Sequence, residues 1–246
     1  MIKQKIRLET TSFSLHIMAM AFMLCDHLWG ASFVKHDIFT CIGRLAFPIY
    51  AFMIVEGYFH TGSLKKYVTR LFLFAVISEI PFNLVMGSRV FFPIHQNVLW
   101  SFLIAIGLIH WNEKTKAKQI WKRVLVAVAT FVIAYIGGLI TFVDYYHSGI
   151  LILLTFYFFR GKKWWHYLGQ LVCMWYINFE MLGGYGYEIT ILGNVHFIAR
   201  QGIALLALIP IWLYQGRQGY HSKALQYFYY AFYPLHLLLL GVLRLF

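Results

Sequence analysis

The chain has 246 residues, of which 61% are hydrophobic and 20% are aromatic. A soluble domain is about 45–50% apolar, so this composition excludes an ordinary soluble protein and predicts an integral membrane protein. The formal net charge is +12, but the basic residues stand between apolar segments rather than along one helix face. We therefore expect membrane topology, and not nucleic-acid binding, to explain the charge.

Apolar segments recur along the whole chain, several of them near the roughly 20 residues that a membrane-spanning helix needs. We expect an all-α, polytopic helical bundle with about nine transmembrane helices, forming a single domain over residues 1–246. The segments at 147–159 and 164–180 are shorter than the others. The expected spans are 13–34, 38–59, 67–87, 95–111, 124–143, 147–159, 164–180, 194–214 and 226–246.

The loops between these spans differ in charge. Cytoplasmic loops are enriched in Lys and Arg, so we expect a cytoplasmic N-terminus and an external C-terminus. The opposite side holds only Lys35, Arg89 and Arg244. The basic residues on the expected cytoplasmic side are Lys3, Lys5, Arg7, Lys65, Lys66, Lys114, Lys116, Lys118, Lys122, Arg123, Arg160, Lys162, Lys163, Arg217 and Lys223.

The first two spans carry charge where a lipid-facing helix would exclude it. The first contains Asp26 and His27 toward its end, and the second contains Arg44 and Glu56. An ionisable side chain inside a hydrocarbon span costs about 3 kcal/mol. We therefore expect these four side chains to face a polar site inside the bundle.

Residues equidistant from a short turn lie at equal depth, which predicts which charges meet. Asp26 and His27 fall level with Arg44, and Glu79 lies within one helical turn, about 5 Å, of the same depth. We expect these four residues to form an outer network in which Glu79 orients His27. A structural alternative is that Asp26 and Arg44 simply neutralise each other. Nearer the cytoplasmic face, we expect a scaffold ion pair between Glu56 and Arg70.

Other polar residues fall in the same outer half of the expected bundle. The glycine-broken stretch GGYGYEITILG, 183–193, predicts a loop or a re-entrant segment over the site. The sequence has no HExxH or paired CxxC spacing, so we expect no metal. The candidate substrate-binding residues are Asn97, Asp144, His147, His196, Arg200 and His236.

Five stretches resemble a known family. They are MLCDH (23–27), IGRLAFPIYAFMIVEGYFHT (42–61), KYVTRLFLFAVISEIPFNL (66–84), DYYHSGILIL (144–153) and FYPLHLL (232–238), spread over nearly the whole chain. In this order they resemble TraX, the conjugal-transfer membrane proteins to which N-terminal acetylation of pilin is attributed. TraX proteins are in turn distantly similar to the acyltransferase 3 family and to heparan-α-glucosaminide N-acetyltransferase.

The resemblance implies an acetyl-CoA-dependent O- or N-acyltransferase in the bacterial cytoplasmic (inner) membrane. Such an enzyme would move an acyl group from cytosolic acyl-CoA to an amine or hydroxyl on the extracytoplasmic side. The acceptor would be the pilin N-terminus, a glycolipid or a cell-surface sugar. His27 would be the general base or would itself carry the acyl group as a covalent acetyl-His intermediate, and the expected catalytic set is His27, Asp26, Arg44 and Glu79.

The resemblance also implies a donor end at the cytoplasmic face. Lys65, Lys66 and Arg70 would meet the phosphates of CoA. In acyltransferase 3 proteins a Lys or Arg lies eleven residues before a His on the first span. His16 and His27 keep that spacing, but His16 is not the usual basic residue. The resemblance therefore places His16 among the residues that bind the CoA donor, but the change from Lys or Arg to His argues against a contact with its phosphates.

Two alternatives of other classes remain. One is a proton-coupled transporter or lipid-handling protein with a charged relay at the membrane midplane, which the absence of a visible inverted repeat disfavours. The other is a non-catalytic partner of a secretion or pilus machine, which the absence of a long loop domain in the sequence disfavours.

Overall fold

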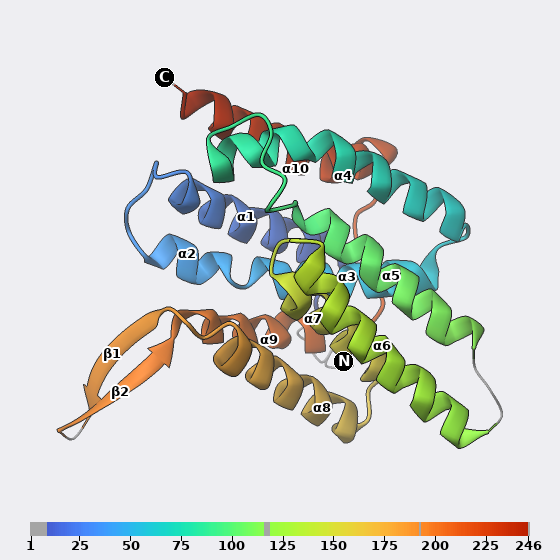
Figure 1. The fold of residues 1–246 in the computed structure, drawn as a ribbon. Helices are drawn as coiled ribbons and strands as arrows, with labels where there is room; N and C mark the ends of the chain where they lie inside the picture. The colour runs from blue at the N-terminus through green and yellow to red at the C-terminus, as the bar shows by residue number, and fades with distance from the viewer. Residues whose placement is uncertain (1–8, 116–118, 192, 246) are drawn as a thin grey trace, which may run out of the picture.

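The computed structural model describes residues 9–115, 119–191 and 193–245, and it is mostly helical (Figure 1). Its α-helices are α1 (Ser12–Gly30), α2 (Ile38–Gly43), α3 (Ala46–His60), α4 (Leu64–Gly87), α5 (Val98–Lys114), α6 (Ile120–Ile140), α7 (Tyr146–Phe158), α8 (Trp164–Trp175), α9 (Leu208–Trp212) and α10 (Lys223–Leu243). A π-helical turn, η1 (Tyr176–Met181), continues α8, and a 3-10 helix, η2 (Arg200–Ala207), leads into α9. The basic residues Lys3, Lys5, Arg7, Lys116 and Lys118, used above for topology, lie outside the described residues.

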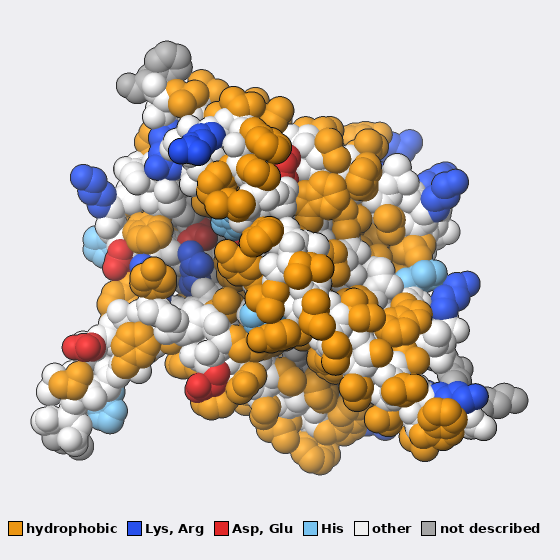
Figure 2. All heavy atoms as spheres, in the orientation of Figure 1, with side chains coloured by type: hydrophobic (Ala, Val, Ile, Leu, Met, Phe, Trp, Pro, Cys, Tyr) orange, Lys and Arg blue, Asp and Glu red, His pale blue; other side chains and the backbone are white. Residues whose placement is uncertain are grey.

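The described helices support a membrane protein. Three helical segments of the described chain are long and apolar enough to cross a bilayer: Ile38–His60, Leu64–Gly87 and Ile120–Ile140. Hydrophobic side chains cover much of the surface, notably along α6, where Val128 is 54% exposed and Ile136 is 53% exposed (Figure 2). Apolar patches of this extent on a protein surface indicate contact with lipid or with another protein.

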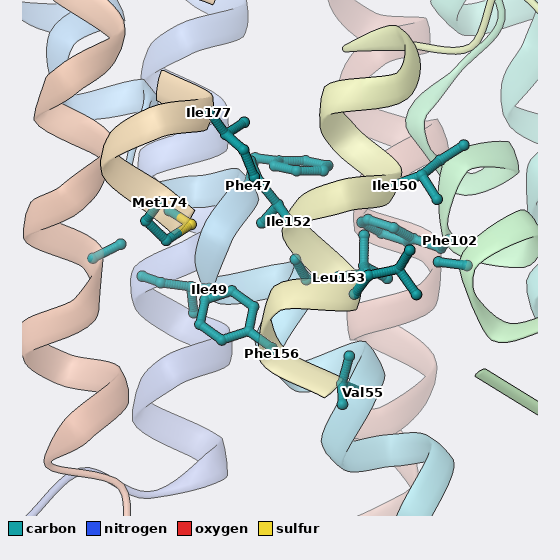
Figure 3. Packing of buried hydrophobic residues seen from close by; sticks show 14 of the residues in the cluster. Phe47, Ile49, Val55, Phe102, Ile150, Ile152, Leu153, Phe156, Met174 and Ile177 are labelled. Atoms are coloured by element: carbon teal, nitrogen blue, oxygen red, sulfur yellow. The ribbon is translucent and has the colours of Figure 1, made fainter. Parts of the chain in front are cut away.

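Helix α7 is the centre of the main hydrophobic core. It is only 13 residues long, yet Ile150, Ile152, Leu153 and Phe156 are all almost fully buried. A helix that is apolar on all sides belongs in the interior. In Figure 3 these side chains lie among residues of α3, α5, α8 and η1. The apolar segment at 147–159 is therefore short because it forms the protein core.

Helices α1 and α10 start side by side. The Thr11 hydroxyl caps α1 by accepting from the Ser14 N–H, and the Ser222 hydroxyl caps α10 by accepting from the Leu225 N–H. Just before α10, the carbonyl of Arg217 accepts from the N–H of Ser12 at 2.9 Å. The two helices pack together and run in the same direction, so equal distances from their starts mean equal depth.

The segment after η1 departs from the sequence prediction. Where the sequence predicts one span over 194–214, the structure has a strand followed by η2 and α9. That strand, β2 (Asn194–Ala199), pairs antiparallel with β1 (Gly186–Ile191), with Gly186 opposite Ala199. The hairpin projects away from the bundle (Figure 1) and does not fold over the interior. Its alternation of apolar and polar residues, such as Val195, His196 and Phe197, is the period of a strand.

Candidate functional site

A cavity of about 1000 Å³ runs through the part of the bundle bounded by α1, α3, α4 and α10. At one end its wall includes His60 and Tyr220, close to the start of α1. At the other end the wall includes His95 and Asp144, close to the end of α1. Four predicted site residues besides Asp144 line it: His16, Asp26, His27 and Arg44. The cavity is therefore the candidate site, and it reaches both ends of the bundle.

His27 lies in the cavity wall and is backed by a second histidine. Its Nδ1 is 2.6 Å from Nε2 of His236, and the two rings are nearly parallel. Nδ1 of His236 is in turn 2.6 Å from the carbonyl oxygen of Phe232. His27 and His236 are 9% and 7% exposed, and only His27 lines the cavity.

This geometry fixes where the protons are. A carbonyl oxygen only accepts, so Nδ1 of His236 carries a hydrogen and, in the neutral ring, its Nε2 accepts. Nδ1 of His27 must then donate to it, which leaves the lone pair of His27 on Nε2. Within the described chain, Nε2 of His27 has no hydrogen-bond partner. The arrangement gives an oriented imidazole with a free basic nitrogen in a cavity wall.

The sequence analysis assigns His236 to substrate binding and Glu79 to the orientation of His27, and both partners differ in the structure. His27 lies about 22 Å along α1 and His236 about 20 Å along α10, at about 1.5 Å per residue. Because these helices are parallel neighbours, the two rings are at equal depth. Counting residues from the two N-caps could have predicted that His27 and His236 lie at equal depth. Predicting their contact also requires knowing that α1 and α10 are adjacent.

The predicted pair between Asp26 and Arg44 is present. Nη2 of Arg44 donates to Oδ1 of Asp26 at 2.5 Å, and each side chain is 20% exposed. The fully buried Thr40 hydroxyl donates to the same oxygen at 2.8 Å. Gly43 permits this approach, because a Cβ there would lie 2.3 Å from Cβ of Asp26.

The other edge of the Arg44 guanidinium reaches two residues that are not among the predicted site residues, Tyr145 and Gln201. Nη1 lies 3.4 Å from the Tyr145 hydroxyl and 3.3 Å from Oε1 of Gln201. The amide nitrogen of Gln201 donates to Oδ1 of Asn178, in η1, at 3.2 Å. Tyr145 has a left-handed backbone, φ 59°, a conformation that is costly for a non-glycine residue and clusters at functional sites. Its ring packs on Phe47 with centroids 4.6 Å apart.

Glu79 does not reach Arg44 or His27. Its Oε2 accepts from the side-chain nitrogen of Asn97 and, at 3.0 Å, from Nε1 of Trp100. Neither Glu79 nor Asn97 lines the cavity. The predicted outer network therefore separates into an Asp26–Arg44 pair and a Glu79–Asn97 contact. Glu79 faces α5 rather than the cavity.

The predicted pair of Glu56 with Arg70 is wrong. Both carboxylate oxygens of Glu56 accept from Arg160, at 2.6 and 3.3 Å. The Arg70 guanidinium instead lies over the ring of Tyr230, 5.6 Å from its centroid. Arg160 stands in the loop between α7 and α8, so a loop far along the chain supplies the countercharge. Comparing depths within the neighbouring helices α3 and α4 could not identify Arg160 as the partner of Glu56.

Several predicted binding residues lie away from the cavity. Lys65 and Lys66 are exposed in the first turn of α4. His147 packs against Tyr135 of α6, with ring centroids 4.4 Å apart. His196 is exposed on the hairpin, and the Arg200 guanidinium lies over Trp29. The residues outside the cavity wall are Lys65, Lys66, Arg70, Glu79, Asn97, His147, His196, Arg200 and His236.

His95 and Asp144 form an ion pair at the end of the cavity close to the end of α1, which we call the outer end. Nε2 of His95 is 3.2 Å from Oδ1 of Asp144, and both side chains are about a third exposed (30% and 28%). The hydrogen bond to the Asp144 carboxylate raises the pKa of His95 above its ordinary value of 6.5. Asp144 is thus committed to His95. Across the described residues, no group of three or more His, Cys, Asp and Glu side chains could hold a metal ion.

Comparison with known proteins agrees with the motifs. The family model described as TraX protein matches residues 12–244. The chain belongs to the TraX family. It is 27% identical over 260 residues to a probable fimbrial assembly protein FimC, serogroup H1, of Dichelobacter nodosus, and the match covers 97% of this chain and 98% of that protein. No solved structure matches the chain.

The stretches that resemble TraX come together around the cavity. Asp26 and His27 end the first stretch, Arg44 lies in the second, Asp144 opens the fourth, and His236 lies in the fifth. Three of the five stretches, far apart in sequence, thus supply one ion pair and one histidine pair. The third stretch, on α4, supplies Tyr67 and Leu71 to the wall. The five stretches that resemble TraX therefore meet at one site.

Proposed function

We propose that this TraX-family protein is a membrane-embedded acyltransferase in which His27 is the general base. The observation that carries the proposal is the relay from His27 to His236 in the wall of a cavity lined from both ends of the bundle. A base needs a fixed tautomer and access to the proton that it removes. The hydrogen bond to His236 supports the first requirement, and the place of His27 in the cavity wall supports the second.

The donor in this proposal is acyl-CoA, with acetyl-CoA as the simplest case. It supplies an acyl carbon activated as a thioester. A cavity of about 1000 Å³ lies at the upper end of the volumes of small-molecule sites, so it can take the extended arm that carries the thioester. Lys65, Lys66 and Arg70 are near the start of α4 and outside the cavity wall. In the proposal they meet only the phosphates, beyond the cavity mouth.

His27 removes the proton of an acceptor amine or hydroxyl as that group attacks the acyl carbon. His236 accepts from Nδ1 of His27 and so stabilises the imidazolium that forms, the task that a carboxylate performs in a Ser-His-Asp triad. His27 then returns the proton to the sulfur as the carbon–sulfur bond breaks. No net proton remains on the protein.

Arg44 and Tyr145 are the groups suited to the oxyanion. Both line the cavity, and their polar atoms lie 3.4 Å apart. Two donors converging on one point stabilise the negative oxygen that develops when the acyl carbon becomes tetrahedral. Asp26 and Thr40 hold the guanidinium in place. Asp26 is in this view a positioning residue, and Glu79 has no direct part.

The acceptor is reached from the outer end. The TraX family is associated with pilin acetylation, and the relative in Dichelobacter nodosus is a probable fimbrial assembly protein. We propose a pilin N-terminus as the first acceptor to try, with glycolipid and cell-surface sugar as further candidates. The proposal includes a single multi-pass domain in the bacterial inner membrane, with a cytoplasmic N-terminus and about nine spans.

The experiment uses purified full-length protein, acetyl-CoA labelled in the acetyl group, and a membrane extract as the source of acceptor. We expect the label to move to an acceptor or to the protein with wild type. His27→Ala should lower that rate by about 10²- to 10⁴-fold, the usual contribution of a general base. His36→Ala is the matched control, because His36 is exposed in the loop between α1 and α2. It should retain wild-type activity.

Either of two outcomes would contradict the proposal. If wild type neither consumes nor binds acetyl-CoA, the protein is not this enzyme. If His27→Ala transfers label as fast as wild type, His27 is not its base. A transporter is the second candidate, because a cavity lined from both ends could also carry a solute. Uptake of label into sealed vesicles without chemical transfer would favour it.

A further inference from the structure

The inner half of the cavity contains a second polar pair, which the proposed chemistry does not use. His16 of α1 and Tyr229 of α10 both line the cavity there. Their rings stack, with centroids 4.3 Å apart and planes 11° from parallel. His16 lies eleven residues before His27, nearly three turns, and so shares its helix face about 16 Å away.

His16 presents an acceptor. Its Nδ1 lies 2.7 Å from the carbonyl oxygen of Ser12, so Nδ1 carries the hydrogen and the lone pair of the neutral ring is on Nε2. Within the described residues, Nε2 has no hydrogen-bond partner. Its position in the cavity wall makes a ligand the available source of a donor.

Tyr229 presents a donor. Its hydroxyl is shielded from solvent and has no hydrogen-bond partner among the described residues. Buried hydroxyl groups in native proteins are nearly always paired, so such an exception calls for an explanation. The side chain lines the cavity, so a turn of the Tyr229 ring toward the cavity would let a chain lying there supply the missing acceptor.

The charged residues of the cavity wall indicate which chemical class of ligand fits between His16 and Tyr229. Within the described chain, the cavity wall holds no Lys, and its Arg, Arg44, lies at the outer end. Phosphate groups need cationic partners or arrays of N–H groups, and a purely alkyl chain would leave both polar atoms unpaired. A secondary amide has one N–H donor and one carbonyl acceptor. It matches Nε2 of His16 and the Tyr229 hydroxyl one to one.

We propose that His16 and Tyr229 form an amide-binding subsite for the pantetheine arm of the acyl-CoA donor. The inference rests on the proposed function for the identity of the donor. The arm carries secondary amides between its phosphate end and its sulfur. An amide held at His16 leaves the sulfur end directed along α1 toward His27, and the phosphates directed to the cavity mouth. The histidine at position 16 therefore suits a neutral group.

The test measures binding, so it does not depend on transfer. Pantetheine, which has the amides but no phosphate, is titrated into purified full-length protein. Tyr229→Phe removes only the hydroxyl and should weaken pantetheine binding about three- to tenfold, the equivalent of one net hydrogen bond. His16→Phe keeps an aromatic ring on Tyr229 and should have a similar effect.

Two matched controls isolate the amide. Tyr230→Phe removes the neighbouring hydroxyl, from a ring that also lines the cavity, and should leave pantetheine affinity unchanged. An alkanethiol of similar length, without amides, should bind wild type and Tyr229→Phe equally. Equal pantetheine affinity in wild type and Tyr229→Phe would overturn the subsite, as would absence of pantetheine binding to wild type.

The subsite and the proposed function fail in different ways. One outcome is that His27→Ala loses acetyl transfer while Tyr229→Phe binds pantetheine as tightly as wild type. This outcome would support the enzyme and contradict the subsite. Tyr229-dependent pantetheine binding without any transfer of label would keep the subsite and remove the enzyme. In the second case the ligand is still an amide-bearing chain.

Discussion

The two ends of the cavity differ in how their polar groups are satisfied. At the outer end, Arg44 is bonded to Asp26, and His27 is bonded to His236. At the inner end, within the described residues, His16 bonds only to Ser12 in its own helix turn, and the Tyr229 hydroxyl has no partner, so neither group is tied to a side chain of another helix. Paired groups keep one geometry, as a reacting centre requires. Unpaired groups can pair with what enters. The difference separates a preorganised end from a binding end.

The largest expected effect comes from breaking the outer ion pair. Arg44→Leu leaves the Asp26 carboxylate without its cation, and removing one partner of a buried pair costs about 3 kcal/mol. The free energy of unfolding in detergent micelles measures this loss. Arg217→Leu is the control, because Arg217 pairs with Glu9 but is 73% exposed. Exposed pairs contribute at most about 1 kcal/mol. If Arg44→Leu and Arg217→Leu lowered the free energy of unfolding equally, the Asp26–Arg44 pair would be no more important for stability than an exposed ion pair.

The histidine relay should affect the rate more than binding. His236→Ala removes the acceptor of the His27 N–H, so the imidazole loses its orientation and its stabilised cation. We expect kcat to fall about 100-fold with little change in KM for the donor. His236→Asn should retain more activity, because its side-chain carbonyl can still accept. Leu239→Ala, at a position 60% exposed on the same helix, serves as the control. A change confined to KM would argue for the substrate-binding role predicted from sequence.

The smallest effect concerns the ion pair that joins His95 to Asp144 at the outer mouth. The Asp144 carboxylate raises the pKa of His95 in the folded protein, so the protonated form stabilises the fold. This stability is fully present below about pH 6.5 and is lost as pH rises through the raised pKa. His95→Gln should therefore lower stability by up to about 1 kcal/mol at low pH.

The same variant should match wild type once His95 is neutral in both states, since glutamine keeps a donor but no charge. Thermal unfolding of wild type and His95→Gln across this pH range is the measurement. A difference that grows as pH rises would contradict the assignment. The effect is small because both side chains are about a third exposed, where water screens the attraction.

The sequence predicts one half of the site better than the other. Asp26 and Arg44 lie in consecutive helical segments joined by a short turn, so counting residues is enough to bring them together. The partner of His27 is on α10, more than 200 positions away in the chain. Glu56 illustrates the same limit, since Arg160 in the loop after α7 takes the place assigned to Arg70. Tyr145 was missed because a left-handed backbone directs it to Arg44.

The hairpin shows a different kind of error. Residues 194–214 are apolar enough to predict a span, yet the structure begins this segment with β2 and continues with η2 and α9. Hydropathy summed over the segment does not separate a strand followed by a short helix from one long helix. The glycines at 183, 184, 186 and 193 mark the turn into the hairpin and its tip. The positions of the glycines were therefore more informative about this segment than its summed hydropathy.

The amino-acid sequence by itself determines that this is a helical membrane protein of the TraX family, with an Asp26–Arg44 pair set in its interior. An apolar composition indicates that the protein lies in lipid rather than in water. Residue number along a helix gives the depth of a side chain, at about 1.5 Å per residue. Depth is only one coordinate. Which way a helix faces and which helix lies beside it are set by side-chain packing, around α7 in one hydrophobic cluster and between α4 and α10 in another. Only the tertiary structure therefore pairs His27 with His236 and turns Glu79 away from the cavity.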